Sequence, residues 1–173
     1  MSPPERPLVV VPGDEPVQIA GSPRLEELAP RADVRLFDTR PSSDREKLER
    51  ASGATVMINS RGAVSWGGEL LRQLPDLKFI TTCGIGTDAI DLAACRELGI
   101  VVSNIPGRSA PVVAEHAFAL MLAISRRTSY FTEAIKHNRW HQVLSTSLGG
   151  KTLGVIGTGN IGSEMIRLSR AFG

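Results

Sequence analysis

Apolar and β-branched runs alternate with more polar, helix-forming stretches along residues 1–103. The apolar runs, each long enough for one strand, occupy residues 8–11, 34–37, 54–58, 77–82 and 100–103. The stretches between them predict helices over residues 22–28, 43–50, 67–74 and 88–98. Strands that alternate with helices through short turns are typical of right-handed crossovers and a parallel sheet. The pattern therefore predicts an α/β fold.

Local signals mark where these helices begin and end. Ser43 and Glu46 form a capping box, in which two side chains satisfy free backbone N–H groups at the helix start. Pro75 stops the third helix because proline has no backbone N–H to donate. Asp88 is the expected N-cap of the fourth helix, and Gly99 is expected to end it in the left-handed conformation.

The pattern changes after Pro106. Apolar residues recur at helical spacing over residues 109–127 and cover so much of that helix that we expect it to be buried between other elements. A polar helix, a small-residue loop, a strand and a last helix are predicted over residues 131–138, 145–150, 152–156 and 161–171. One strand cannot form a sheet alone. We therefore interpret the final strand and helix as the first βα unit of another domain, with the boundary near Asn104.

Composition and charge narrow the function classes. The chain of 173 residues is 42% hydrophobic and carries a formal net charge of +2, which argues against nucleic acid or an anionic membrane as partner. The run at residues 8–11 ends at Pro12, and no stretch approaches the roughly 20 apolar residues of a membrane span. Cys83 and Cys95 form no CxxC motif, which favours reduced thiols and a cytoplasmic location. We expect Cys83 to be a small buried residue.

A glycine pattern, G-x-G-x-x-G, joins the last predicted strand to the last predicted helix and consists of Gly157, Thr158, Gly159, Asn160, Ile161 and Gly162. The first glycine permits a tight turn, the second lets backbone approach a pyrophosphate, and the third lets helix and strand pack closely. The alternative is a tight strand–helix turn without a ligand. The acidic residue that selects the ribose is expected about 20 residues further on, after Gly173, so NAD and NADP both stay open as cofactor.

Several segments in matching order and spacing resemble the D-isomer-specific 2-hydroxyacid dehydrogenases. They are the nucleotide-binding segment, the substrate loop, two parts of the interdomain passage and the strand before the substrate loop, at residues 150–162, 84–91, 104–107, 113–116 and 74–80. The resemblance covers residues 54–173, whereas residues 1–53 agree only in pattern.

The resemblance implies two domains. Residues 1–103 would form a flavodoxin-like substrate domain, and residues 104–173 the truncated start of a Rossmann NAD(P)-binding domain. Long helices in the second part would form a homodimer contact in the complete protein. The implied activity is that of an NAD(P)-dependent oxidoreductase, which oxidises the CH–OH group of a small D-2-hydroxyacid or reduces a 2-oxoacid.

The resemblance also implies which residues hold the substrate carboxylate, namely Arg61, Gly84, Ile85 and Gly86. A guanidinium offers forked donors to a carboxylate, and glycines let a loop aim backbone N–H groups at an anion. The alternatives are a solvated turn residue for Arg61 and plain turn geometry for the glycines. Ala89 stands where many family members have Asn, so whatever that amide fixes in the loop is not expected here.

Polar and apolar residues of the second part have simpler interpretations. Val113 is similar to the position that packs under the nicotinamide ring, although its spacing alone indicates a core residue. Glu115 and His116 are interpreted as hydrogen-bonded structural groups of a buried helix. His137 and His141 have a spacing that can bind metal on a helix, but no third ligand is evident, so we expect a solvated face and no metal.

The family's catalytic Arg, Glu and His would all lie downstream of the glycine turn, at positions beyond Gly173. There the histidine acts as general acid–base, the glutamate orients it, and the arginine polarises the carbonyl. No catalytic residue is therefore assigned, and residues 1–173 alone are expected to be inactive. The alternative class is a dinucleotide-sensing binding or scaffolding protein without turnover.

Overall fold

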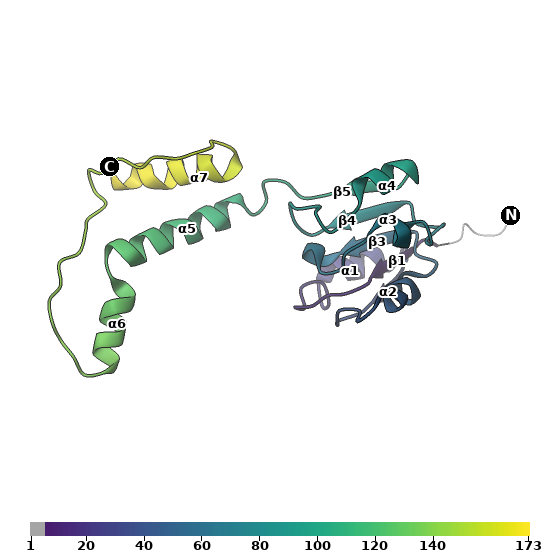
Figure 1. Ribbon diagram of the computed structural model, residues 1–173, viewed down its shortest axis with the longest axis horizontal. Helices are drawn as coiled ribbons and strands as arrows, with labels where there is room; N and C mark the ends of the chain where they lie inside the picture. The colour runs from purple at the N-terminus through teal and green to yellow at the C-terminus, as the bar shows by residue number, and fades with distance from the viewer. Residues whose placement is uncertain (1–5) are drawn as a thin grey trace. The chain divides into compact units, whose positions relative to one another are not determined.

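The computed structural model describes residues 6–173. The chain forms two compact units, Met1–Pro106 and Gly107–Gly173, which we call the first and the second unit (Figure 1). Each unit is described by itself.

The first unit is built on a five-stranded parallel sheet with the strand order β2-β1-β3-β4-β5 (Figure 1). Val10 of β1, for example, pairs in parallel with Arg35 of β2 and with Met57 of β3. The sheet confirms the predicted α/β fold, and its order is the flavodoxin-like one. The strands are β1 (Leu8–Val11), β2 (Asp33–Leu36), β3 (Val56–Asn59), β4 (Phe79–Thr82) and β5 (Val101–Ser103).

Short helical segments connect the strands of the first unit. They are α1 (Pro23–Leu28), α2 (Asp44–Ala51), the 3-10 turn η1 (Ser60–Gly62), α3 (Gly68–Leu71) and α4 (Leu92–Glu97). One half of the predicted capping box is present, since the Ser43 hydroxyl oxygen accepts a hydrogen bond from the N–H of Glu46 at 3.2 Å. The carboxylate of Glu46 accepts from the N–H of Ser42 at 2.7 Å, one residue before the position that a capping box uses.

The N-cap predicted at Asp88 is wrong. Asp91 caps α4, and its carboxylate accepts a hydrogen bond from the N–H of Ala94 at 3.0 Å. The backbone before α4 is held by a distant segment instead: Ile90 forms a β-bridge with Trp66, and the Asp91 N–H donates to the Trp66 carbonyl at 3.0 Å. These tertiary bonds delay the start of the helix.

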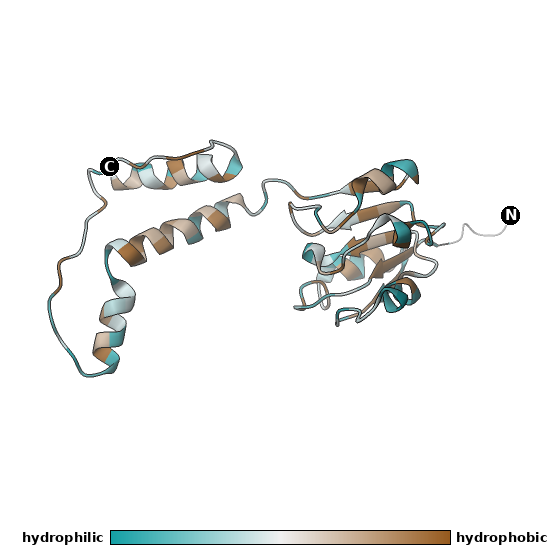
Figure 2. Cartoon of the chain, viewed as in Figure 1, coloured by the Kyte–Doolittle hydropathy of each residue, from teal (hydrophilic) through white to brown (hydrophobic). Residues whose placement is uncertain are grey.

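Apolar side chains from the sheet and its helices form one core in the first unit. Met57 of β3 and Ile80 of β4 are fully buried, and Trp66 and Leu71 are each 1% exposed. Figure 2 shows the contrast between brown strands and the teal surface of α2. Burial of a large apolar side chain contributes about 1.5–3 kcal/mol, so this core fixes the strands and the positions of the loops that leave them.

The second unit contains three helices, α5 (Ala110–Ser125), α6 (Thr128–Lys136) and α7 (Asn160–Ser169), followed by the 3-10 turn η2 (Arg170–Phe172). Helices α5 and α7 lie side by side (Figure 1). The rings of Phe118 and Phe172 contribute to this packing, with their centroids 4.8 Å apart. Across residues 6–173, no helix combines the length and the apolar character that crossing a bilayer requires.

The strand predicted over residues 152–156 is wrong, because this segment has no regular secondary structure. Ile156, at its end, is fully exposed. A strand needs a neighbour for its backbone N–H and C=O groups, and residues 107–173 contain no second strand. The β-branched sequence is therefore not sufficient for a strand here.

The prediction that the first long helix is buried between other elements is also wrong. Helix α7 covers the face of α5 that carries Ala114 and Phe118, which are 0% and 7% exposed. On the remaining surface of α5, Leu120 is 51% exposed and Ile124 is 78% exposed. The apolar stripe predicted the helix, but its burial depends on which elements pack against it.

Candidate functional site

The carboxyl ends of the parallel strands bring together the residues predicted to bind a substrate carboxylate. The strand order reverses between β1 and β3, and ligands of open α/β sheets bind beyond the carboxyl ends at such a switch point. Arg61 follows β3 within η1, and residues 84–86 follow β4. Asp14 follows β1 and Asn104 follows β5. We call these residues the carboxyl-edge site.

Arg61 has a backbone conformation that is uncommon for a residue with a side chain. Its φ of 47° and ψ of 31° lie in the left-handed region, and Gly62 follows with a φ of 69°. The side chain is exposed. A Cβ placed on Gly84 would lie 4.0 Å from the Arg61 Cα. The fold therefore places Arg61 directly beside the loop that follows β4.

The loop at residues 84–86 uses its acceptors and leaves its donors free. The Gly84 carbonyl accepts a hydrogen bond from the Ile105 N–H at 3.0 Å, and the Ile85 carbonyl accepts from Asn104 Nδ2 at 2.8 Å. Among the described residues, the N–H groups of Ile85 and Gly86 have no hydrogen-bond acceptor. Free, adjacent N–H groups form a concave positive site for an anion. The loop thus has the polarity that carboxylate binding needs.

Asp14 is a buried carboxylate that the sequence interpretation missed. It is 0% exposed, and Oδ2 accepts hydrogen bonds from the N–H groups of Ile19 and Ala20 at 2.8 Å. The Gln18 N–H and the Ser60 hydroxyl donate to Oδ1 at 3.0 and 3.1 Å. Burial raises the pKa of Asp14, but the hydrogen bonds from the three backbone groups and from Ser60 outweigh it and lower the pKa. Asp14 is therefore a carboxylate at neutral pH.

Asn59 is a second buried polar residue that the sequence interpretation missed. It is 0% exposed at the end of β3. Its Nδ2 donates to the Val64 carbonyl at 2.8 Å, and its Oδ1 accepts from the Val64 N–H at 3.3 Å. The signal available in the sequence was a polar residue at or shortly after the end of an apolar strand. Asn59 is the last residue of β3, and Asp14 is the third residue after β1.

Cys83 was expected to be buried, and this expectation is wrong. Cys83 is exposed, whereas Cys95 is buried. The reason is that β4 ends at Thr82, so Cys83 lies in the loop that follows β4 and not in the sheet. Desolvation of the thiol, and then the negative charge of Asp14, raise the pKa of Cys83. The thiol is therefore protonated at neutral pH, which argues against a nucleophilic role.

The glycine turn of the second unit is tightly packed at Gly162 and has free space at Gly159. Gly157 has a φ of 87°, which glycine adopts readily. A Cβ on Gly162 would overlap the Gly157 carbonyl oxygen and lie 3.3 Å from Val155 Cγ1. A Cβ on Gly159, by contrast, would meet no atom within 4 Å. This is the pattern expected when one glycine is needed for packing and another leaves room for a ligand.

The intervening residues Thr158, Asn160 and Ile161 complete this turn. The Thr158 carbonyl accepts a hydrogen bond from the Ser163 hydroxyl at 3.0 Å. Helix α7 begins at Asn160, and Gly159 is its N-cap. The first N–H groups of a helix have no partner within the helix and carry the positive end of its dipole. A phosphate would meet favourable charge at this position.

Other residues singled out from the sequence lie on open surface. Val113 is 42% exposed and so is not a core residue. Glu115 and His116 are both exposed, so their interpretation as hydrogen-bonded groups of a buried helix is wrong. The α7 side of α5 is the covered one, and these residues lie outside it.

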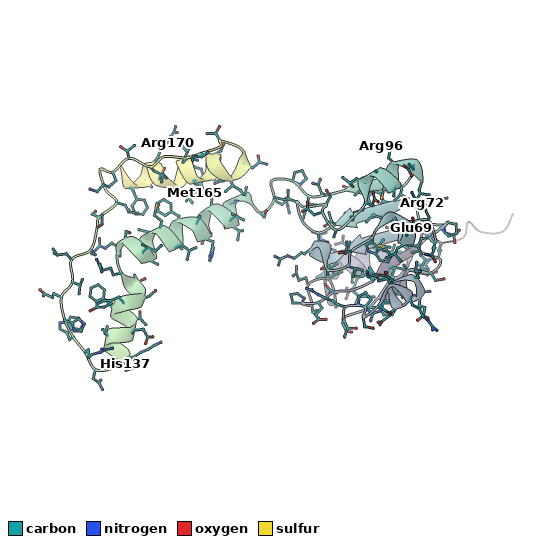
Figure 3. The ribbon with its side chains drawn as sticks, viewed as in Figure 1. Glu69, Arg72, Arg96, His137, Met165 and Arg170 are labelled. Atoms are coloured by element: carbon teal, nitrogen blue, oxygen red, sulfur yellow. The ribbon has the colours of Figure 1, made fainter. Side chains whose placement is uncertain are left out.

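The two histidines near the end of α6 are also on the surface. His137 lies at the C-terminal end of this helix (Figure 3), and its Nδ1 lies 2.9 Å from the Glu133 carbonyl oxygen. His141 is exposed and packs edge to face with Tyr130 at 5.7 Å between centroids. Within residues 6–173, no group of three or more His, Cys, Asp or Glu residues could hold a metal ion.

Comparison of the sequence with known proteins finds similarity to one family of dehydrogenases. Residues 14–148 match the family described as D-isomer specific 2-hydroxyacid dehydrogenase, catalytic domain. The chain is 43% identical over 132 residues to a hydroxypyruvate reductase of Thermotoga maritima, and the match covers 75% of this chain and 43% of that protein. It is 35% identical over 136 residues to a D-3-phosphoglycerate dehydrogenase of Archaeoglobus fulgidus, which covers 78% of this chain and 26% of that protein.

Solved structures give the same result. An acyclic imino acid reductase, Bsp5, in complex with NADPH and D-Arg superposes with a TM-score of 0.84 at 27% identity, over 95% of this chain and 53% of that one. A glyoxylate reductase from Paecilomyes thermophila superposes with a TM-score of 0.81 at 27% identity, over 96% of this chain and 53% of that one. The chain thus spans about half the length of these structures.

Proposed function

Because the chain belongs to the D-isomer specific 2-hydroxyacid dehydrogenase family, we propose that the complete protein is an NAD(P)-dependent oxidoreductase of D-2-hydroxyacids. In the reverse direction it reduces a small 2-oxoacid. The observation that carries this proposal is that, at the carboxyl-edge site, the backbone of Arg61 lies beside the loop after β4, whose N–H groups at Ile85 and Gly86 are free.

In this proposal, the substrate carboxylate binds between Arg61 and residues 84–86. The guanidinium supplies two parallel donors that match the two carboxylate oxygens. The N–H groups of Ile85 and Gly86 also donate to the anion, while the Ile85 carbonyl oxygen is already hydrogen-bonded to Asn104 Nδ2. A hydrogen bond to a charged group contributes about 1.5–3 kcal/mol. Three or four such bonds therefore supply enough free energy to bind a small carboxylic acid.

The second unit fits a dinucleotide, NAD or NADP. Gly157, Gly159 and Gly162 would hold the pyrophosphate, because the space beside Gly159 is free and the first turn of α7 presents unpaired N–H groups. Thr158, Asn160 and Ile161 complete the turn, and Val113 is exposed and thus free to contact the nicotinamide ring. When bound, the cofactor supplies or accepts the hydride.

Proton transfer requires a group from outside the first unit. All three histidines of the chain, His116, His137 and His141, belong to the second unit. General acid–base help is worth about 10²–10⁴-fold in rate, and the carboxyl-edge site has no imidazole of its own. His116, His137 and His141 are exposed surface residues, and the family resemblance places the catalytic histidine after Gly173. We therefore propose that residues 1–173 alone do not turn over substrate, and that a histidine of the complete protein outside these residues acts as the acid.

We also propose that the complete protein is a homodimer. Trp140 and Leu144 of the second unit are 84% and 93% exposed, as is much of the apolar surface of α5. Apolar patches of this kind mark protein contacts. Light scattering is expected to give about twice the mass of one complete chain, and a monomer at assay concentration would contradict the proposal.

The substrate site is tested by Gly86→Val in the product of the complete reading frame. A Cβ at Gly86 meets only the flexible Asp88 carboxylate, at 3.1 Å, so the fold accepts the change while the branched side chain blocks the approach to the N–H groups. We expect the KM for glyoxylate, hydroxypyruvate or pyruvate to rise by about tenfold or more, with a smaller change in the KM for NADH or NADPH. Gly67→Ala is the matched control, because a Cβ there meets nothing within 4 Å.

Two outcomes would contradict the proposal. An unchanged substrate KM in the Gly86→Val variant would remove the assignment of the loop. Tight binding of NADH without turnover of any 2-oxoacid by the complete product would favour a dinucleotide-sensing protein instead.

A further inference from the structure

We propose that Asp14 is a positioning residue which, through Ser60, holds Arg61 in the conformation that receives the substrate carboxylate. The inference rests on the proposed function, because it takes Arg61 as the carboxylate-binding residue. It assigns a role to a side chain on the opposite side of the β1–β3 switch point.

The first observation is that Asp14 is a buried charge without a cationic partner. It is 0% exposed, and no Lys or Arg of the described residues forms an ion pair with it. A buried carboxylate is costly unless hydrogen bonds replace its hydration. Four donors do so here: the backbone N–H groups of Gln18, Ile19 and Ala20, and the hydroxyl of Ser60.

The second observation is that the only side-chain donor among the four comes from the residue next to Arg61. The Ser60 hydroxyl donates to Asp14 Oδ1 at 3.1 Å, and Ser60 is 3% exposed. The Ser60 carbonyl accepts from the Ala63 N–H at 2.8 Å. Both the side chain and the carbonyl of Ser60 are therefore fixed, which sets the direction in which the chain enters Arg61.

The third observation is that Arg61 occupies a conformation that has to be enforced. A left-handed backbone is unfavourable for arginine and persists where the surroundings over-determine it. The Asn59 side chain joins the two ends of the turn through its two bonds to Val64, and Asp14 anchors the residue directly before Arg61 through Ser60. Buried polar groups whose hydrogen bonds converge on one turn of an exposed arginine are typical of preorganised binding residues.

An acceptor without donors is needed at position 14. A carboxylate accepts from all four donors at once. An asparagine has only one acceptor oxygen, and its NH₂ group would point at other donors and could not accept from them. The negative charge also lies near an anion site, since it raises the pKa of Cys83. The four hydrogen bonds to Asp14 stabilise this charge. Asp14 therefore contributes to substrate binding by fixing the backbone of Arg61, and not by attracting the substrate anion electrostatically.

The test is a double-mutant cycle in the product of the complete reading frame, with Asp14→Asn, Arg61→Ala and the double variant. For Asp14→Asn we expect the KM for the 2-oxoacid to rise by about tenfold, the loss of one hydrogen bond to a charged group, with kcat and the KM for NADH changed far less. In the Arg61→Ala background, Asp14→Asn should add no further rise, because its effect acts through Arg61.

Ser60→Ala covers the case in which Asp14→Asn fails to fold, since it removes one hydrogen bond and leaves the carboxylate with its three backbone donors. It should raise the substrate KM in the same direction, while Ser52→Ala, on the exposed end of α2, should not. The positioning role alone would be overturned if Asp14→Asn raised the substrate KM by the same factor in the wild-type and Arg61→Ala backgrounds. An unchanged substrate KM in Ser60→Ala would also overturn it. An unchanged KM in Arg61→Ala would overturn the substrate site and this inference together.

Discussion

Gly162 lies so close to Gly157 that a Cβ on Gly162 would overlap the Gly157 carbonyl oxygen. The first turn of α7 thus closes directly onto the tight turn before it. Gly159, between them, has free space on the side where its Cβ would project. The two glycines therefore differ in what they contribute, one to the packing of the turn and the other to access.

Gly162→Ala is expected to destabilise the second unit, whereas Gly159→Ala is not. Overpacking costs about 1–3 kcal/mol, and here the Cβ would overlap a backbone carbonyl oxygen, that of Gly157, and not the end of a flexible side chain. Urea unfolding followed by circular dichroism measures the difference. Equal stability of the two variants would contradict the packing role, and Gly159→Ala should still weaken NADH binding if the pyrophosphate approaches there.

Arg61→Gly is expected to stabilise the fold while it weakens substrate binding. Glycine adopts the φ of 47° without the steric cost that arginine bears, so we expect a gain of up to about 1 kcal/mol. The substrate KM should rise because the guanidinium is lost. Urea unfolding measures the expected gain in stability, and steady-state kinetics on the same sample measure the expected rise in substrate KM. A loss of stability in this variant would show that the arginine side chain supports the turn.

Asp14→Asn is expected to lower the pKa of Cys83. Desolvation raises that pKa first, and the negative charge of Asp14 raises it further, so removing the charge removes the second contribution. The rate of alkylation of Cys83 across a pH series reports this pKa, since Cys95 is buried and reacts slowly. Asp76→Asn, an exposed change elsewhere in the first unit, serves as the control. An unshifted alkylation profile would indicate that Asp14 is not charged.

Acid is expected to weaken the first unit through Glu46. The Ser42 hydroxyl and N–H, followed by the Arg50 guanidinium, lower the pKa of Glu46 from 4.5 to about 2. A carboxylate with a depressed pKa stabilises the fold fully above its unfolded pKa, and the contribution is lost as the pH falls through the folded value. Stability should therefore decline between about pH 4.5 and 2.

Glu46→Gln tests this assignment, because the amide carries no charge to titrate. Urea unfolding of the variant should show a shallower decline with acid over the same pH window, with the remaining decline due to Asp14, whose pKa is also lowered. Parallel pH profiles for the two proteins would contradict the role of Glu46.

Features of local origin were predictable from the sequence. The five apolar runs became the five strands. The central strands β1, β3 and β4 bury apolar side chains in the core, whereas the edge strands β2 and β5 are mostly exposed. Ser43 begins α2 because its hydroxyl oxygen reaches a backbone N–H three residues away. The glycine pattern was recognisable for the same reason, since the steric demands on Gly157 and Gly162 arise within one turn. Arg61 and residues 84–86 were identified through the family resemblance, and only the fold shows that they are neighbours.

Features that depend on residues distant in the sequence were decided only by the tertiary structure. Asp91 instead of Asp88 caps α4 because Trp66 holds the preceding backbone. Residues 152–156 have strand-forming sequence but no strand, since ladder hydrogen bonds need a second chain segment. Three of the four hydrogen-bond donors to Asp14 are backbone groups four to six residues away, but the fourth is Ser60, 46 residues away, and no local pattern encodes such a bond. Short-range hydrogen bonds and apolar periodicity can be read along a chain, whereas long-range burial and polar contacts exist only once the chain has folded.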